Sequence, residues 1–102
     1  MPNVNVSMSS SLDPKIAFDK VSSYLNQSDE LRKLDSSYTC QFNESALSGD
    51  LRGKLFSATL KVEGHTQGSL VDIQVKLPLA LAFASKKVKA TLETYLHKTL
   101  NG

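Results

Sequence analysis

Residues 54–77, KLFSATLKVEGHTQGSLVDIQVKL, and residues 79–100, LALAFASKKVKATLETYLHKTL, decide the fold of this 102-residue chain. Apolar and polar residues alternate over 56–62 and again over 71–77, which is the pattern of two half-buried β-strands. From residue 84 onward the apolar residues recur with the period of an α-helix. The stretch therefore predicts two neighbouring strands followed by a closing amphipathic helix.

The segment before these strands has its apolar residues on the opposite parity. Up to Leu51 the apolar residues fall on one parity, and from Phe56 they fall on the other. A pattern with a period of two cannot change parity without an extra residue, so residues 52–54 must hold a turn or a glycine bulge. We favour a hairpin turn, which makes 46–52 and 54–63 separate strands.

The remaining elements follow from the same two periods. Alternation predicts strands at 3–8 and 38–43, and helical spacing predicts a helix at 13–26 with a short second piece at 29–35. The order is β-α-β-β-β-β-α with this short helical insert. It predicts an α+β fold, in which an antiparallel sheet of four to five strands has a long C-terminal helix across one face. We expect this helix-grip-like, two-layer sandwich to place the C-terminal helix over the strands at 54–63 and 71–77.

The composition is that of a single globular domain spanning residues 1–102. The chain is 40% hydrophobic and 22% charged, which is ordinary for such domains. No apolar run approaches the roughly 20 residues of a membrane span, and the N-terminus lacks the pattern of a secretory signal. We therefore expect a cytoplasmic protein without a transmembrane segment.

The residue types that carry out catalysis or bind metals are sparse and scattered. Cys40 falls on the buried parity of its strand, where a small buried thiol is the usual role. Nothing in the spacing connects Cys40 to His65 in a predicted loop or to His97 near the C-terminus, and these residues lack the spacing of a zinc site. We expect no catalytic residues, no metal and no cofactor, and hence a non-enzymatic protein.

The tract from Leu79 to Phe83 is a candidate surface site. It is almost wholly apolar and precedes a cluster of lysines, while residues 51–102 carry eight basic and only three acidic groups. One interpretation is a buried helix start or an extended edge strand. The other is an exposed apolar edge with a basic rim, suited to a hydrophobic or lipid-like surface, a protein partner or a second copy of the chain. The residues expected to form it are Leu79, Leu81, Phe83, Lys86, Lys87 and Lys89.

A second candidate site is an apolar pocket between the sheet and the C-terminal helix, which would carry a small hydrophobic ligand. The residues expected to line it are Phe56, Leu60, Ile73, Val75, Leu92 and Tyr95.

Three segments resemble the bacterial polyhydroxyalkanoic acid system family. They are FSATLKV at 56–62, VDIQVKLP at 71–78 and LETYL at 92–96, so the resemblance covers mainly residues 54–100. The family is named for its association with polyester storage granules. The resemblance implies a granule-associated accessory protein and carries no catalytic residues.

A rival resemblance is to the RNA-binding domains of ribosome-hibernation proteins. Their basic helices contact ribosomal RNA, and the C-terminal helix here, together with Arg52 and Lys54, is basic. Strong phosphate binding usually involves many more cationic side chains, so we rank nucleic acid second.

Overall fold

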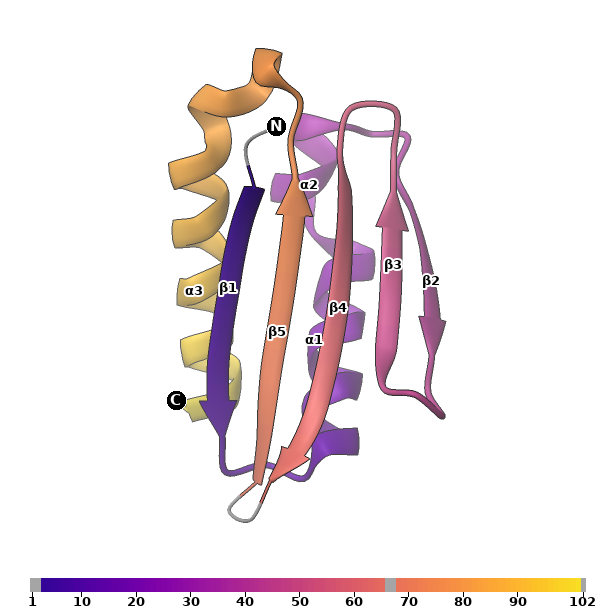
Figure 1. Cartoon of the computed structure of the whole chain (residues 1–102), viewed down its shortest axis with the longest axis vertical. Coiled ribbons are helices and arrows are strands. Elements are labelled where there is room, and N and C mark those ends of the chain that lie inside the picture. Colours follow the sequence, from indigo (N-terminus) through magenta and orange to yellow (C-terminus); the bar gives the residue numbers. More distant parts are fainter. Residues whose placement is uncertain (1–2, 66–67, 102) are drawn as a thin grey trace.

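The computed structural model describes residues 3–65 and 68–101 as a five-stranded antiparallel sheet with helices on one face (Figure 1). The strand order is β1-β5-β4-β3-β2. This arrangement confirms the predicted α+β, helix-grip-like fold. The strands are β1 (Asn3–Ser10), β2 (Thr39–Asn43), β3 (Ser48–Arg52), β4 (Ser57–His65) and β5 (Gly68–Lys76). The helices are α1 (Pro14–Gln27), α2 (Asp29–Leu34), the 3-10 helix η1 (Leu79–Ala84) and α3 (Ser85–Asn101).

The two long helices cover different parts of the same sheet face (Figure 1). α1 packs against β4 and β5, whereas α3 packs chiefly against β1. The expectation that α3 would cover β4 and β5 is therefore wrong. β1 pairs with β5 and extends the sheet on that side, and α1 already covers β4 and β5, so β1 is the strand left for α3.

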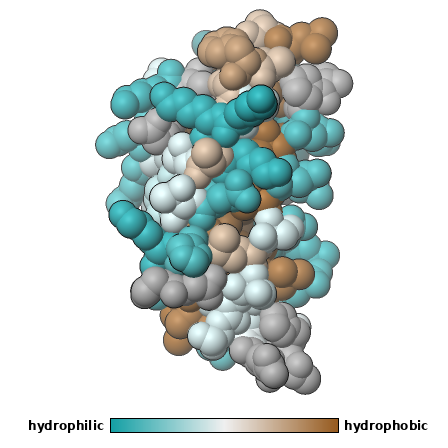
Figure 2. Space-filling view, turned by 90° about the vertical axis from the view of Figure 1, so that its left-hand side faces the viewer, coloured by the Kyte–Doolittle hydropathy of each residue, from teal (hydrophilic) through white to brown (hydrophobic). Residues whose placement is uncertain are grey.

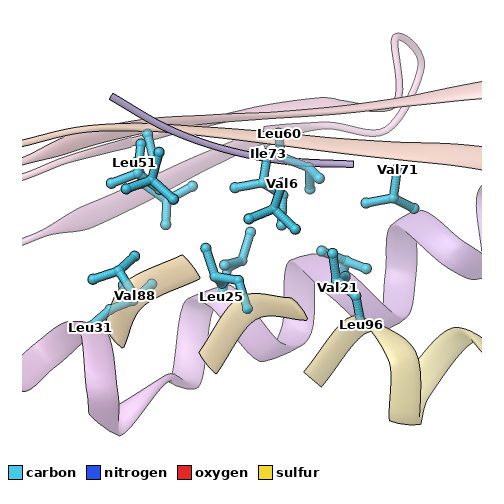
Figure 3. Packing of buried hydrophobic residues seen from close by; sticks show 14 of the residues in the cluster. Val6, Val21, Leu25, Leu31, Leu51, Leu60, Val71, Ile73, Val88 and Leu96 are labelled. Carbon is cyan, nitrogen blue, oxygen red and sulfur yellow. The ribbon is translucent and has the colours of Figure 1, made fainter. Parts of the chain in front are cut away.

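One layer of apolar side chains fills the space between the sheet and the helices. Each of the ten residues labelled in Figure 3 is at most 6% exposed. Figure 3 shows the strand residues Val6, Leu51, Leu60, Val71 and Ile73 facing the helix residues Val21, Leu25, Leu31, Val88 and Leu96. The outward-facing side chains between them on the strands are polar, such as Asn5, Thr59 and Gln74. This alternation gives the sheet one buried and one solvated face.

The first strand is longer than the sequence predicted. β1 continues through Ser9 and Ser10, because their backbones pair with Leu70 and Ser69. The hydroxyl of buried Ser10 has two partners, because its Oγ accepts a hydrogen bond from the N–H of Leu12 at 3.0 Å and donates one to the Leu100 carbonyl at 3.4 Å. Backbone pairing therefore extends the strand although the apolar alternation has ended.

The predicted hairpin turn around Gly53 is present. β3 ends at Arg52 and β4 begins at Ser57, and the Gly53 N–H donates to the Phe56 carbonyl at 2.9 Å. The turn takes up more residues than expected, so β4 starts later than predicted. A Cβ atom at Gly53 would collide with Oδ2 of Asp35 and lie 2.8 Å from its Cγ, which explains why glycine occupies this position.

Two other predicted boundaries shift in the structure. The strand expected from residue 46 begins at Ser48, because Leu47 has a φ of 51°, which is outside the strand region. The loop expected at 63–68 is shorter, because β4 runs to His65 and β5 starts at Gly68. The rest of that expected loop, residues 66–67, lies outside the described residues.

Residues 79–84 open the C-terminal helix and do not extend a strand. Pro78 precedes η1 in an extended conformation, and its carbonyl accepts from the Leu81 N–H at 2.9 Å. Proline cannot donate to a sheet ladder, which accounts for the end of β5 just before it. The Oγ of Ser85 donates to the Ala82 carbonyl at 2.8 Å where η1 passes into α3.

Candidate functional site

The 3-10 helix η1 presents two large apolar side chains to solvent. Leu79 is 79% exposed and Phe83 is 81% exposed, whereas Ala84 is buried and Leu81 is half-buried. A 3-10 helix has about three residues per turn, so residues three apart share a side. Leu81 and Ala84 therefore face the core together, which turns Leu79 and Phe83 outward.

The exposed apolar side chains of η1 lie at one end of the molecule. Figure 1 shows η1 at the top, beyond the ends of the strands, and Figure 2 shows hydrophobic side chains gathered there above a largely hydrophilic flank. We call the exposed apolar surface formed here by Leu79 and Phe83 the apolar tip. Of the three apolar residues predicted for the surface site, Leu79 and Phe83 are exposed, whereas Leu81 packs against the core and does not belong to the exposed surface.

Three exposed lysines follow the apolar tip on the first turns of α3. Lys86 and Lys89 border a depression beside Asn3 and Asn5 of β1. Lys87 instead lines a pocket against α1 and α2. The lysines therefore flank the tip on two sides and do not form one continuous basic face.

The six residues predicted to line a pocket under α3 have different surroundings. Phe56, Leu60, Ile73, Val75 and Leu92 are at most 3% exposed and belong to the packed core. Leu60 and Ile73 are cross-strand partners, and Phe56 packs against Tyr38 with ring centroids 5.5 Å apart. Tyr95 is half-buried and stacks on Tyr24 of α1.

A small pocket lies between the helices. It has a volume of about 70 Å³, and α1, α2 and their link face η1 and α3 across it. Of the six residues named above, only Leu92 lines it. The lining residues are Tyr24, Ser28, Leu31, Lys33, Ala84, Lys87, Val88, Thr91 and Leu92.

Local hydrogen bonds hold the α1–α2 side of this pocket. The Ser28 Oγ caps α2 by accepting from the Leu31 N–H at 3.3 Å. The Tyr38 hydroxyl donates to the Leu25 carbonyl at 2.7 Å, at the C-terminal end of α1. These bonds fix the sharp change of direction between α1 and α2, and they hold Leu31 against the core.

The sequence contained no signal for this pocket. Tyr24, Leu31 and Lys33 lie more than fifty positions before the α3 residues that they face. Their meeting depends on how α2 leaves α1, which periodicity does not specify. Only Lys87 and Leu92 were among the predicted site residues, and they had been assigned to two different sites.

Cys40 and the histidines remain apart. Cys40 is half-buried, its Sγ lies 4.0 Å from the Leu25 carbonyl, and burial raises the pKa of the thiol. His97 is exposed on α3, and the side chain of His65 lies outside the described residues. Within residues 3–65 and 68–101, no three metal-binding side chains are grouped as an ion site requires.

None of the described helices is long and apolar enough to cross a membrane.

No protein-family model matches the sequence, and no curated protein is significantly similar to it. Among the solved structures that match, two are similar over nearly the whole length of both chains. Crystal structures of TTHA0849 from Thermus thermophilus and of Ara h 8.0201 match with TM-scores of 0.60 and 0.54 and identities of 11% and 14%. The matches cover 96% of this chain and 93% of TTHA0849, and 95% of this chain and 98% of Ara h 8.0201. The shared fold is the α+β, helix-grip-like one described above. At these identities the likeness establishes the fold alone.

Proposed function

We propose that the protein is a non-enzymatic cytoplasmic accessory protein that attaches to the surface of a hydrophobic particle through the apolar tip. The observation that supports this most is the exposure of Leu79 and Phe83, at 79% and 81%. Large exposed apolar side chains with charged residues nearby are typical of interaction surfaces. The resemblance to the polyhydroxyalkanoic acid system family suggests a polyester storage granule as the particle.

The sizes of the expected contributions to the binding free energy favour reversible attachment. Burying a leucine or phenylalanine side chain contributes about 1.5–3 kcal/mol, and each lysine near an anionic surface adds about 1 kcal/mol. Leu79 and Phe83 supply the apolar term, and Lys86, Lys87 and Lys89 supply the electrostatic one. The translational and rotational freedom that the protein loses on binding offsets part of this favourable free energy. The proposal therefore implies salt-sensitive attachment to particles that carry negative charge.

Co-sedimentation with particles tests the proposal. The wild-type protein is mixed with polyhydroxybutyrate particles coated with phosphatidylglycerol, and compared with the L79S/F83S variant. The matched control is Ile16→Ser on α1, which removes an apolar side chain that is 49% exposed at a different place. We expect binding of L79S/F83S to fall at least about tenfold, because both apolar anchors are lost, and Ile16→Ser to bind as the wild type does.

Two results would contradict the proposal. One is equal binding of the wild type and L79S/F83S. The other is a wild-type protein that forms dimers through the tip, seen as a mass by size-exclusion chromatography with light scattering that L79S/F83S reduces to the monomer. In the second case the tip is an interface between copies of the chain.

A further inference from the structure

We propose that the outer edge of β1 binds an extended segment of a partner protein as a sixth, antiparallel strand, and that this segment carries an acidic side chain. The proposal rests on a row of outward backbone groups beside two exposed lysines. It does not depend on the apolar tip, because neither Leu79 nor Phe83 borders the depression at this edge.

The registers of the strands show which backbone groups of β1 point out of the sheet. Along an antiparallel strand, residues that exchange hydrogen bonds with one neighbouring strand alternate with residues that face the other side. The Val62 N–H donates to the Leu47 carbonyl at 2.9 Å, so the even-numbered residues of β4 bond to β3 and the odd-numbered ones bond to β5. Carried through the registers of β5 and β1, this alternation turns the N–H and carbonyl groups of Asn3, Asn5 and Ser7 away from β5.

These outward groups lie on an edge that the chain leaves open. β1 is an end strand of the sheet, and within residues 3–65 and 68–101 no hydrogen bond from another segment reaches the outward backbone groups of Asn3, Asn5 or Ser7. Edge strands are usually guarded by a charged residue, a proline, a bulge or a short length. β1 has eight residues without a charge or a proline, and its pairing with β5 is continuous, whereas β2 at the opposite edge has only five residues. The β1 edge is therefore where a further strand can pair.

The position of α3 decides between a second copy of β1 and a segment of another protein. α3 packs against β1 and lies alongside it at this edge (Figure 1). Antiparallel pairing of two β1 strands would place both α3 helices on the same face, with axes about 5 Å apart as the strands are. Packed helices need about 8–10 Å. A single added strand lies in the plane of the sheet and meets α3 only through its side chains, so a partner segment fits and a second copy does not.

Two lysines of α3 favour an acidic side chain on the added strand. Lys86 and Lys89 are exposed and border the depression beside Asn3 and Asn5. Neither lysine forms an ion pair with a described carboxylate. On the added strand, the residue opposite Val4 points to the same face of the sheet as buried Val4, which is the face that α3 covers. A carboxylate at that position therefore lies beside two positive charges.

Nuclear magnetic resonance titration with a seven-residue peptide tests the proposal. The peptide acetyl-TVTVTET-amide has its threonines on the parity that bonds to β1 and its glutamate opposite Val4. We expect saturable shifts of the Asn5 and Ser7 amides, and hydrogen exchange of these amides slowed at least about tenfold at saturation. The peptide with lysine in place of glutamate should bind at least about threefold more weakly, because its charge is repelled by Lys86 and Lys89.

Modified peptides and two variants locate the contacts. Methylation of the threonine nitrogens at peptide positions three and five removes the donors that face Ser7 and Asn5, and should abolish the slowed exchange. Methylation of the valine nitrogens at positions two and four is the matched control, because these nitrogens point to solvent. Lys86→Gln and Lys89→Gln should each weaken binding about threefold. Lys98→Gln, in the last turn of α3, should leave binding unchanged.

The outcomes separate this edge from the apolar tip. L79S/F83S should bind the peptide as the wild type does, and loss of binding in this variant would overturn the proposal by placing the peptide at the tip. Unchanged exchange at Asn5 and Ser7, or equal binding of the peptide methylated at positions three and five, would also overturn it. Equal affinity for the lysine peptide would refute the requirement for an acidic side chain. Protection of Asn5 and Ser7 that grows with the concentration of the protein alone would contradict the proposal by showing a second copy at the edge.

Discussion

The rings of Tyr24 on α1 and Tyr95 on α3 are stacked, with centroids 3.5 Å apart and planes 14° from parallel. The Tyr95 hydroxyl also donates to the Lys20 carbonyl at 3.0 Å. These contacts join two helices that pack on different strands of the sheet. Because Tyr24 also lines the pocket, the stack fixes the spacing of the two helices that enclose it.

A double-mutant cycle measures the stabilisation from this stack. Replacing Tyr24, Tyr95 or both by leucine should reveal a coupling free energy of unfolding of about 0.5–1.5 kcal/mol, as expected for an aromatic pair. Urea unfolding followed by circular dichroism gives the four values. Tyr95→Phe is the control, because it keeps the ring and removes only the bond to Lys20. Additive effects of the two leucine substitutions would show that the stack does not stabilise the fold.

Asp35 should make stability depend on pH in the acid range. Its carboxylate accepts hydrogen bonds from the Ser37 hydroxyl and from the N–H groups of Ser37 and Leu55, the last at 2.7 Å. The Ser37 hydroxyl, followed by the Leu55 N–H, lowers the pKa of Asp35. A pKa that is lower in the folded state contributes stability above the unfolded value of about 3.9, and this stability is lost as the pH falls through the folded value.

The comparison of wild type with Asp35→Asn tests this dependence. The difference in free energy of unfolding should be largest at neutral pH and should shrink as the pH falls towards about 2. Urea titrations at several pH values provide the measurement. A difference that stays constant or grows on acidification would contradict the role given to Asp35.

Gly53 should tolerate no side chain. A Cβ atom there would collide with the Asp35 carboxylate and lie 3.1 Å from Cβ of Tyr38. Gly53→Ala should therefore lower the free energy of unfolding by roughly 1–3 kcal/mol. Gly64→Ala is the control on an exposed strand position, where the nearest atom is Cγ of Pro14 at 3.1 Å, and it should cost less. An equal effect at the two positions would contradict the argument from Asp35.

The core and the apolar tip should respond differently to the loss of a leucine. Leu96 is fully buried under the sheet, and Leu96→Ala should lower the free energy of unfolding by about 2–5 kcal/mol. Leu79→Ala should change it by no more than about 0.5 kcal/mol, because this side chain lies in solvent. Thermal unfolding of both variants checks the contrast. A large loss of stability in Leu79→Ala would show that the tip packs against the protein, which would weaken the proposed function.

The sequence predicted the sheet well because one face of it is buried. Burial of one face produces the alternation along β4 and β5 and the parity change between Leu51 and Phe56. These patterns are local, so the sequence alone predicts them. Ser9 and Ser10 were missed because backbone pairing with β5 needs no apolar side chain. The packing of α3 against β1 was not predicted, because it depends on the pairing of β1 with β5, which joins distant parts of the chain.

The sequence predicted the candidate sites less well than it predicted the fold. The sequence left open whether Leu79 and Phe83 were buried, because their exposure depends on the three-residue turn of η1. It placed a pocket between the sheet and α3, where the core side chains pack. The pocket found in the structure depends on the contact between α2 and α3, for which the local pattern gave no indication.

The most direct test of the proposed function uses a tryptophan at the tip. The chain contains no tryptophan, so Phe83→Trp carries a single fluorescent reporter at an exposed position. On addition of coated polyhydroxybutyrate particles, we expect its emission to shift to the blue, because the indole enters an apolar phase. Ile16→Trp, the control, should keep the emission of a water-exposed indole. Co-sedimentation of Phe83→Trp without any blue shift would contradict attachment through the apolar tip.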